Sequence, residues 1–259
     1  MTDRRDTRWV ALIAIGLIGG VLSGAFGIGG GIVMVPLLLS VARMDQRRAA
    51  ATSLVAIVPA SIVGSLTYFT QGEIDVIAGL IIAVGAVAGA IIGARLLRVL
   101  PLVWLRWMFI ALLVVVAIRT LLVSPERGDA LELSGWLALG YVALGLVMGI
   151  ASGLFGIGGG VIAVPSLIVL FGMSDLIAKG TSLLVMIPTG VAGTITHARN
   201  RAVDVRAGLI VGVAATVASI PGVWLALVIP ARLSAILFAV LMLFAAAQLT
   251  VKAVRGRES

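Results

Sequence analysis

The chain has 259 residues, of which 61% are hydrophobic and only 12% are charged, and its mean hydropathy is +1.22. A soluble domain carries about a quarter charged residues, so the composition excludes an ordinary soluble protein and predicts an all-α, polytopic helical membrane protein. The formal net charge is +8, but the arginines lie in short loops and at both tails, where positive charges set the orientation of a membrane protein. Nucleic acid is therefore not an expected partner.

Apolar segments of membrane-spanning length follow one another, and a polar stretch divides them into two halves. About 20 apolar residues suffice to cross the hydrocarbon core. The first half has segments near 9–42, 50–70, 75–97 and 102–123, and the second has segments near 134–172, 178–198, 204–228 and 232–252. We expect a first transmembrane repeat at 1–123, a linker at 124–133 and a second transmembrane repeat at 134–259.

The two halves resemble each other in sequence. The stretch Ser23 to Gly31, followed by Val35-Pro36, returns as Ser152 to Gly160, followed by Val164-Pro165. The matched residues stay 129 positions apart, without a gap, from about residue 20 to residue 96. A duplicated hydrophobic chain that glycine interrupts at the same place in each half points to a transporter with a central binding site.

The first segment of each half is unusual, because it is too long for one straight span and too short for two. In the first half its middle, Gly24–Gly31, has five glycines in eight residues, which makes a poor helix interior. Non-helical backbone at membrane depth is tolerated only where protein buries it or water reaches it. We expect a helix, an unwound glycine tract and a second helix that begins near Ile32.

Loop charges favour one topology over another. Arginines precede and follow the segment 9–42, which places both of its ends in the cytoplasm and makes it a re-entrant hairpin. Each half then crosses the membrane an odd number of times, so the halves are inverted repeats and both termini are cytoplasmic. The alternative counts 9–42 as one crossing and gives eight spans with parallel halves, but it leaves the arginines of 43–48 and 95–106 outside.

The unwound tracts are the candidate binding site. Unwinding frees backbone N–H groups, and the helix starts that follow direct partial positive charge to the same place, which together form an anion cradle. We expect both cradles to bind substrate through Gly27, Gly29, Gly30, Gly31, Gly156, Gly158, Gly159 and Gly160. Glycines spaced as GxxxG, such as Gly16, Gly20 and Gly24, are better explained by close helix packing.

Hydroxyl pairs open the next span of each half. Thr52-Ser53 and Thr181-Ser182 occupy matching positions in the repeat, and we include all four residues in the expected substrate site. Hydroxyl groups at a helix start either bind the oxygens of an anion or cap the helix, and the sequence favours neither role.

Charged side chains offer little further chemistry. Lys179, which replaces Ala50 of the first half, is expected to extend toward the lipid headgroups, and His197 is expected at the membrane interface. Asp75 and Asp204 lie at span starts, where a carboxylate stabilises the helix N-terminus. The chain has no cysteine and one histidine, so we expect no catalytic residue, no metal site, no cofactor and no enzyme activity.

The glycine elements resemble the sulfite exporter TauE/SafE family, also called the sulfonate uptake permease family. That family is marked by a duplicated GxxxGxxGxGGGxxxxPxL element, each copy followed by a TS-containing span. Here the element runs from Gly20 to Gly31 with Pro36, and from Gly149 to Gly160 with Pro165. The resemblance implies a plasma-membrane protein that moves sulfite, sulfonates or related small anions, and it implies about eight spans.

These observations predict a secondary transporter of a small anion, either sulfite, a sulfonate or a related organosulfur oxyanion, that works by alternating access. The alternatives are an anion channel and a transporter of a non-sulfur carboxylate. The expected location is the inner (plasma) membrane as a multi-pass protein, so the partners are a small anionic substrate and the lipid bilayer. The oligomeric state stays open, with a homo-oligomer among the alternatives.

Overall fold

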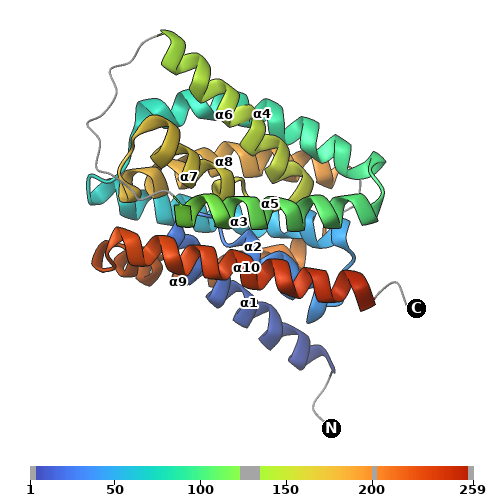
Figure 1. Cartoon of the computed structure of the whole chain (residues 1–259). Coiled ribbons are helices and arrows are strands. Elements are labelled where there is room, and N and C mark those ends of the chain that lie inside the picture. Colours follow the sequence, from blue (N-terminus) through green and yellow to red (C-terminus); the bar gives the residue numbers. More distant parts are fainter. Residues whose placement is uncertain (1–3, 123–134, 200–202, 256–259) are drawn as a thin grey trace.

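The computed structural model describes residues 4–122, 135–199 and 203–255, and the described residues form helices joined by short loops (Figure 1). The expected linker 124–133 lies outside these ranges. The helices are α1 Arg4–Phe26, α2 Gly31–Ser40, α3 Gln46–Thr70, α4 Val76–Val99, α5 Leu102–Leu122, α6 Gly135–Phe155, α7 Gly160–Phe171, α8 Asp175–Ala198, α9 Val205–Val228 and α10 Ala231–Arg255. Among the described residues, eight helices are long and apolar enough to cross a membrane, whereas α2 and α7 are shorter. The predicted class, a polytopic helical membrane protein, is confirmed.

The long first segment of each half is broken at its glycine tract, as predicted. In the first half α1 ends at Phe26 and α2 begins at Gly31, and in the second half α6 ends at Phe155 and α7 begins at Gly160. Three glycines of each break have a positive φ, between 67° and 87°. Glycine adopts this left-handed conformation readily and other residues do so at a cost, which explains why the break is built from glycine.

Small residues let α1 pack on α9 and α4 pack on α6, each pair joining one half of the chain to the other. A Cβ added at Gly85, Gly89 or Gly93 of α4 would collide with a carbonyl oxygen of α6. Likewise Gly16, Gly20 and Gly24 of α1 lie against carbonyl oxygens of α9. The packing role expected for the GxxxG glycines is confirmed.

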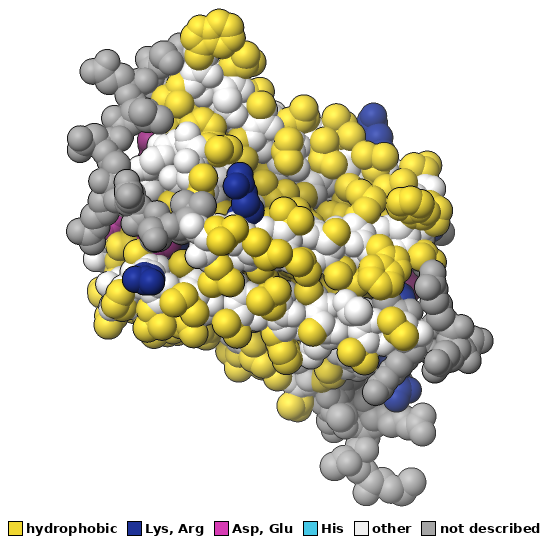
Figure 2. All heavy atoms as spheres, viewed as in Figure 1, with side chains coloured by type: hydrophobic (Ala, Val, Ile, Leu, Met, Phe, Trp, Pro, Cys, Tyr) yellow, Lys and Arg dark blue, Asp and Glu magenta, His cyan; other side chains and the backbone are white. Residues whose placement is uncertain are grey.

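Two basic side chains, Arg48 of α3 and Arg206 of α9, lie at one end of the bundle, which we call the basic end. Arg48, just inside α3, forms an ion pair of 3.0 Å with Asp204 at the start of α9, and the guanidinium of Arg206 lies 4.5 Å from the ring centre of Trp9 in α1. In Figure 1 the start of α1 and the end of α10 lie toward the same end of the bundle, and the end of α5 and the start of α6 lie toward the other. Figure 2 shows hydrophobic side chains over most of the visible face, as a surface in contact with lipid tails requires.

The starts of α3 and α8 correct one expectation. Asp45 caps α3 through Arg48 N–H, and Ser174 caps α8 through Ile177 N–H. Thr52 and Thr181 therefore lie inside their helices, and the N-cap role for the hydroxyl pairs is wrong. The helix-start role of Asp75 and Asp204 is confirmed, because each side chain accepts a hydrogen bond from the backbone N–H three residues later.

Candidate functional site

The two glycine tracts, residues 27–31 and 156–160, lie directly against each other in the interior. A Cβ added at Gly31 would lie 2.5 Å from Ile157 Cα, and one added at Gly160 would lie 2.5 Å from Gly27 O. All residues of both tracts are buried. Glycine is therefore required twice here, for its conformation and for the close approach of the two backbones.

Unpaired backbone donors gather at this contact. Within the described parts of the chain, no hydrogen bond engages the N–H groups of residues 28–32 or of residues 157–161. These groups precede or begin α2 and α7, whose N-termini carry partial positive charge. Buried N–H groups without partners are uncommon in proteins and favour an anionic acceptor.

Serine hydroxyls cross from each half to the tract of the other. Ser53 Oγ donates to Gly156 O and Ser182 Oγ donates to Gly27 O, both at 2.5 Å. The carbonyl oxygens at the edges of the tracts are thus occupied, while the N–H groups are not. The two bonds are equivalent in the repeat, because Ser182 follows Ser53 by 129 positions and Gly156 follows Gly27 by the same number.

The threonines of the hydroxyl pairs lie beside loops instead. Thr52 Oγ1 accepts a hydrogen bond of 3.1 Å from the N–H of Asp204, and Thr181 Oγ1 accepts one of 2.9 Å from the N–H of Asp75. Each threonine therefore holds the loop before α9 or α4 in the opposite half. The structure brings the eight glycines and the two serines together, and it places the two threonines one position earlier in α3 and α8, against the loops.

Ile57 and Met186 fill the space beside the tracts, and sequence reasoning missed both. A Cβ added at Gly29 would lie 2.7 Å from Met186 Sδ and 3.0 Å from a methyl of Ile57, and one added at Gly158 would meet the same two side chains. Ile57 and Met186 are also 129 positions apart. The repeat offset, applied to the span after each hydroxyl pair, is the signal that could have found them.

His197 lies in the last turn of α8, at the end of a helix of spanning length, and its ring is buried in the protein. Its side chain is 2% exposed, and Nε2 lies 3.1 Å from Gly153 O. The matching residue Tyr68 is also buried and donates from its hydroxyl to Gly24 O at 2.8 Å. Both rings thus bind the last turn of the helix that precedes a glycine tract.

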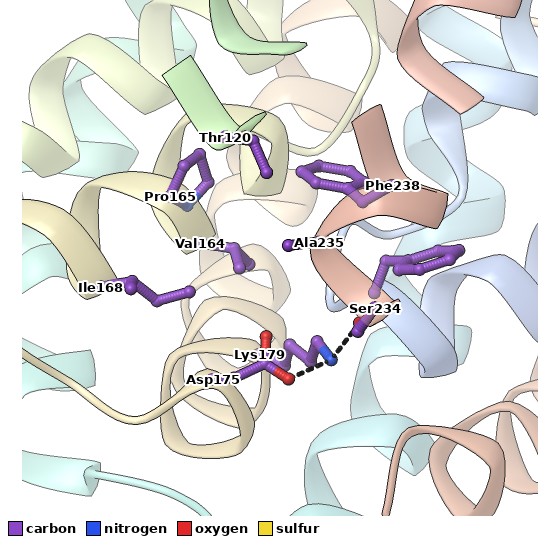
Figure 3. Close-up of a pocket in the computed structure, with 10 residues that line it drawn as sticks. Thr120, Val164, Pro165, Ile168, Asp175, Lys179, Ser234, Ala235 and Phe238 are labelled. Atoms are coloured by element: carbon purple, nitrogen blue, oxygen red, sulfur yellow. Dashed lines mark hydrogen bonds and ion pairs between the residues drawn. The ribbon is translucent and has the colours of Figure 1, made fainter. Parts of the chain in front are cut away.

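Lys179 is buried in the protein and does not extend to the headgroups, which corrects a second expectation. It is 2% exposed, and its Nζ donates to Asp175 Oδ2 at 2.6 Å and to Ser234 Oγ at 2.8 Å (Figure 3). Its Cα would lie 2.6 Å from a Cβ added at Gly27, so it adjoins the first tract. Beside it is a small pocket of about 30 Å³, partly open to the outside.

In the part of the chain that the structure describes, eight apolar helices of spanning length and two buried helix breaks define the class, a multi-pass membrane protein. The sequence profile described as Sulfite exporter TauE/SafE matches residues 1–120 and 141–259. The chain belongs to this family of membrane transporters.

Several similar proteins carry matching descriptions. The probable membrane transporter protein YunE of Bacillus subtilis is 27% identical over 213 residues, which cover 73% of this chain and 78% of that protein. A probable membrane transporter protein of Xylella fastidiosa is 31% identical over 198 residues, covering 74% and 71%. The probable membrane transporter protein MamO of Magnetospirillum gryphiswaldense is 37% identical over 135 residues, covering 46% of this chain and 21% of that protein.

Proposed function

We propose that the protein is a secondary transporter that moves a small oxyanion, namely sulfite, a sulfonate or a related organosulfur anion. One observation carries the proposal: at the contact of two buried glycine tracts, ten backbone N–H groups have no hydrogen-bond partner among the described residues. Such a cradle holds negative charge without needing a cationic side chain. The family description names a sulfite exporter, which agrees with an oxyanion.

The transport mechanism we propose is alternating access between two inverted halves. Its support is the position of the helix ends, because the start of α1 and the end of α10 lie toward one end of the bundle while the end of α5 and the start of α6 lie toward the other. Inverted halves provide two equivalent arrangements of the same contacts. The serine bonds to Gly27 and Gly156 are equivalent in this way, so loosening one while keeping the other would open the site to one side.

The same topology assigns the sides of the membrane. We propose that the basic end faces the cytoplasm, together with both termini, because positive residues are enriched in cytoplasmic loops. The plasma membrane is the proposed location. The partners are then the bilayer and a small anion.

Flux into liposomes tests this function. Purified protein is reconstituted, a gradient of labelled sulfite or methanesulfonate is applied, and initial rates are measured against concentration. A carrier gives saturable flux and faster exchange when the same anion is present on the other side. Flux that rises linearly with concentration would identify a channel, and transport of acetate in preference to either sulfur anion would overturn the substrate class.

A further inference from the structure

An ion pair lies inside the second half where the first half has no charge. Lys179 is 2% exposed, and its Nζ lies 2.6 Å from Asp175 Oδ2, one helical turn earlier in α8 (Figure 3). The matching positions of the first half are Ala50 and Gln46. Apolar residues of similar size often stabilise a protein as well as a buried ion pair does, so stability alone does not explain this difference. Charged residues inside membrane spans mark pathways of ions or protons.

The pair lies at the end of the bundle opposite the basic end. Helix α3 starts at the basic end, and the loop that follows its other end lies on the first turns of α8. A Cβ added at Gly180 would lie 2.2 Å from Glu73 O of this loop, and the N–H of Asp75 donates to Thr181 Oγ1. In the proposed topology this end faces the outside of the cell.

Asp175, Lys179 and the first glycine tract follow one another from this end toward the interior. Asp175 is the first residue of α8, and 13% of its side chain is exposed. The pocket of about 30 Å³ beside the pair has room for about one water molecule. Such a water brings a proton to the carboxylate, whereas an organic anion does not fit. Lys179 lies one turn deeper, and its Cα would lie 2.6 Å from a Cβ added at Gly27.

Asp175 is the acid that pairs with Lys179 among the residues that the structure describes. The second hydrogen bond of the ammonium goes to Ser234 of α10, a hydroxyl group that carries no charge. The pocket lining that α1, α5 and α7 contribute is free of charged side chains. Other charged or titratable side chains on the elements around the start of α8 are Tyr68 and Glu73 at the end of α3, Asp75 before α4, Tyr141 of α6 and the exposed Arg119 of α5 and Arg232 of α10.

Charge balance gives the pair a task in anion transport. While both groups are charged the pair is neutral, so an anion in the tract adds a net negative charge inside the membrane, which is costly. When a proton from water joins the Asp175 carboxylate, the ion pair becomes a hydrogen bond between the ammonium and a neutral acid. The pair then carries one positive charge, which balances one monovalent anion. The anion favours this protonation, and by reciprocity the proton tightens anion binding by the same factor.

We propose that Asp175 and Lys179 form a proton-binding site that couples proton movement to anion movement. The proton reaches Asp175 from the outside through the water-sized pocket, stays bound while an anion occupies the tract, and leaves with the anion when the site opens to the other side. One proton moves with each monovalent anion, and the sum of their charges is zero. The inference rests on the proposed transport function and adds its coupling ion.

Proteoliposomes that contain the full-length protein test this site with labelled methanesulfonate, which keeps one negative charge at every pH used. The membrane potential is held at zero with potassium and valinomycin. A pH lower outside by one unit is expected to drive accumulation of about tenfold, and pyranine trapped inside reports the protons that enter with the anion. The concentration for half-maximal exchange at equal pH is expected to rise with pH, because fewer carboxylates are then protonated.

Asp175→Asn keeps the shape of the side chain and the positive charge of Lys179, but it takes up no proton. This variant is expected to exchange methanesulfonate with a lower half-saturation concentration that no longer depends on pH, and to lose both the accumulation and the pyranine signal. Asp175→Glu keeps a carboxyl group and should retain both. The matched control is Glu73→Gln, which removes the carboxylate of the neighbouring loop and should leave proton coupling unchanged.

The results that overturn the inference differ from those that overturn the proposed function. Accumulation by Asp175→Asn in response to the pH gradient would show that the proton binds elsewhere. An unchanged protein that exchanges methanesulfonate but neither accumulates it nor acidifies the interior would remove the proton site and leave the transport function standing. Absence of exchange with both methanesulfonate and sulfite would overturn the transport function, and the coupling site with it.

Discussion

At the scale of single residues, the glycines of a tract have different neighbours, so a side chain added at each of them has a different expected effect. Gly29 and Gly158 lie against the flexible side chain of Met186 and against Ile57. Gly30 and Gly159 lie against the carbonyl oxygens of Gly19 and Met148. A side chain can move aside, whereas a backbone carbonyl in a packed helix cannot.

Gly29→Ala is therefore expected to leave the protein folded and to weaken anion binding. The positive φ costs about 1–2 kcal/mol, and the methyl group occupies the cradle. The matched control is Gly72→Ala, because Gly72 also has a positive φ, of 76°, with nothing within 4 Å of an added Cβ. On thermal unfolding Gly72→Ala measures the cost of the positive φ alone, and Gly29→Ala adds the displacement of Met186. Only Gly29→Ala should lose affinity; equal affinity in both would contradict the cradle.

Ser53→Ala and Ser182→Ala are expected to lower stability, each by about 1–3 kcal/mol, because each leaves a buried carbonyl of the opposite tract without a partner. Equilibrium unfolding in mixed micelles measures the loss. Similar losses for the two variants follow from their equivalent positions. A loss in only one would show that the serine bonds are not equivalent.

At the scale of elements, the sequence predicted those features that local chemistry decides. The helix breaks were predicted because five of the eight residues 24–31 are glycines. The roles of Asp75 and Asp204 were predicted because a carboxylate stands at the start of each span. The burial of Lys179 and His197 could not be predicted, because it depends on partners 55 and 44 positions away, Ser234 and Gly153. The residue that matches Ser234 in the first half is Leu105, so the repeat does not predict Ser234 as the partner of Lys179.

The α4–α6 contact gives a prediction at this scale. Gly89→Leu is expected to prevent folding, because a side chain at Gly89 would collide with the carbonyl oxygen of Leu146. Ala88→Leu on the exposed side of the same helix adds the same bulk toward lipid and should be tolerated. The fraction of monodisperse protein in gel filtration compares them, and a monodisperse Gly89→Leu variant would contradict close packing as the reason for the glycine.

At the scale of the whole molecule, the account requires that both termini and the basic end share one side of the membrane. The chain has no cysteine, so single cysteines placed at exposed positions report their side without background. Arg43→Cys and Arg199→Cys should be labelled only after the membrane is opened, and Gln71→Cys should be labelled from outside. Labelling of the Arg43 position from outside would favour eight spans with parallel halves.

The central claim is that backbone N–H groups of two facing glycine tracts hold an anion inside the membrane. Anomalous diffraction from crystals grown with selenite, the heavier analogue of sulfite, locates the anion directly. The account predicts one selenium peak beside the tracts, within hydrogen-bond reach of N–H groups of residues 28–32 and 157–161. A protein that transports selenite but shows its selenium elsewhere, with no anion at the N–H groups of either tract, would contradict it.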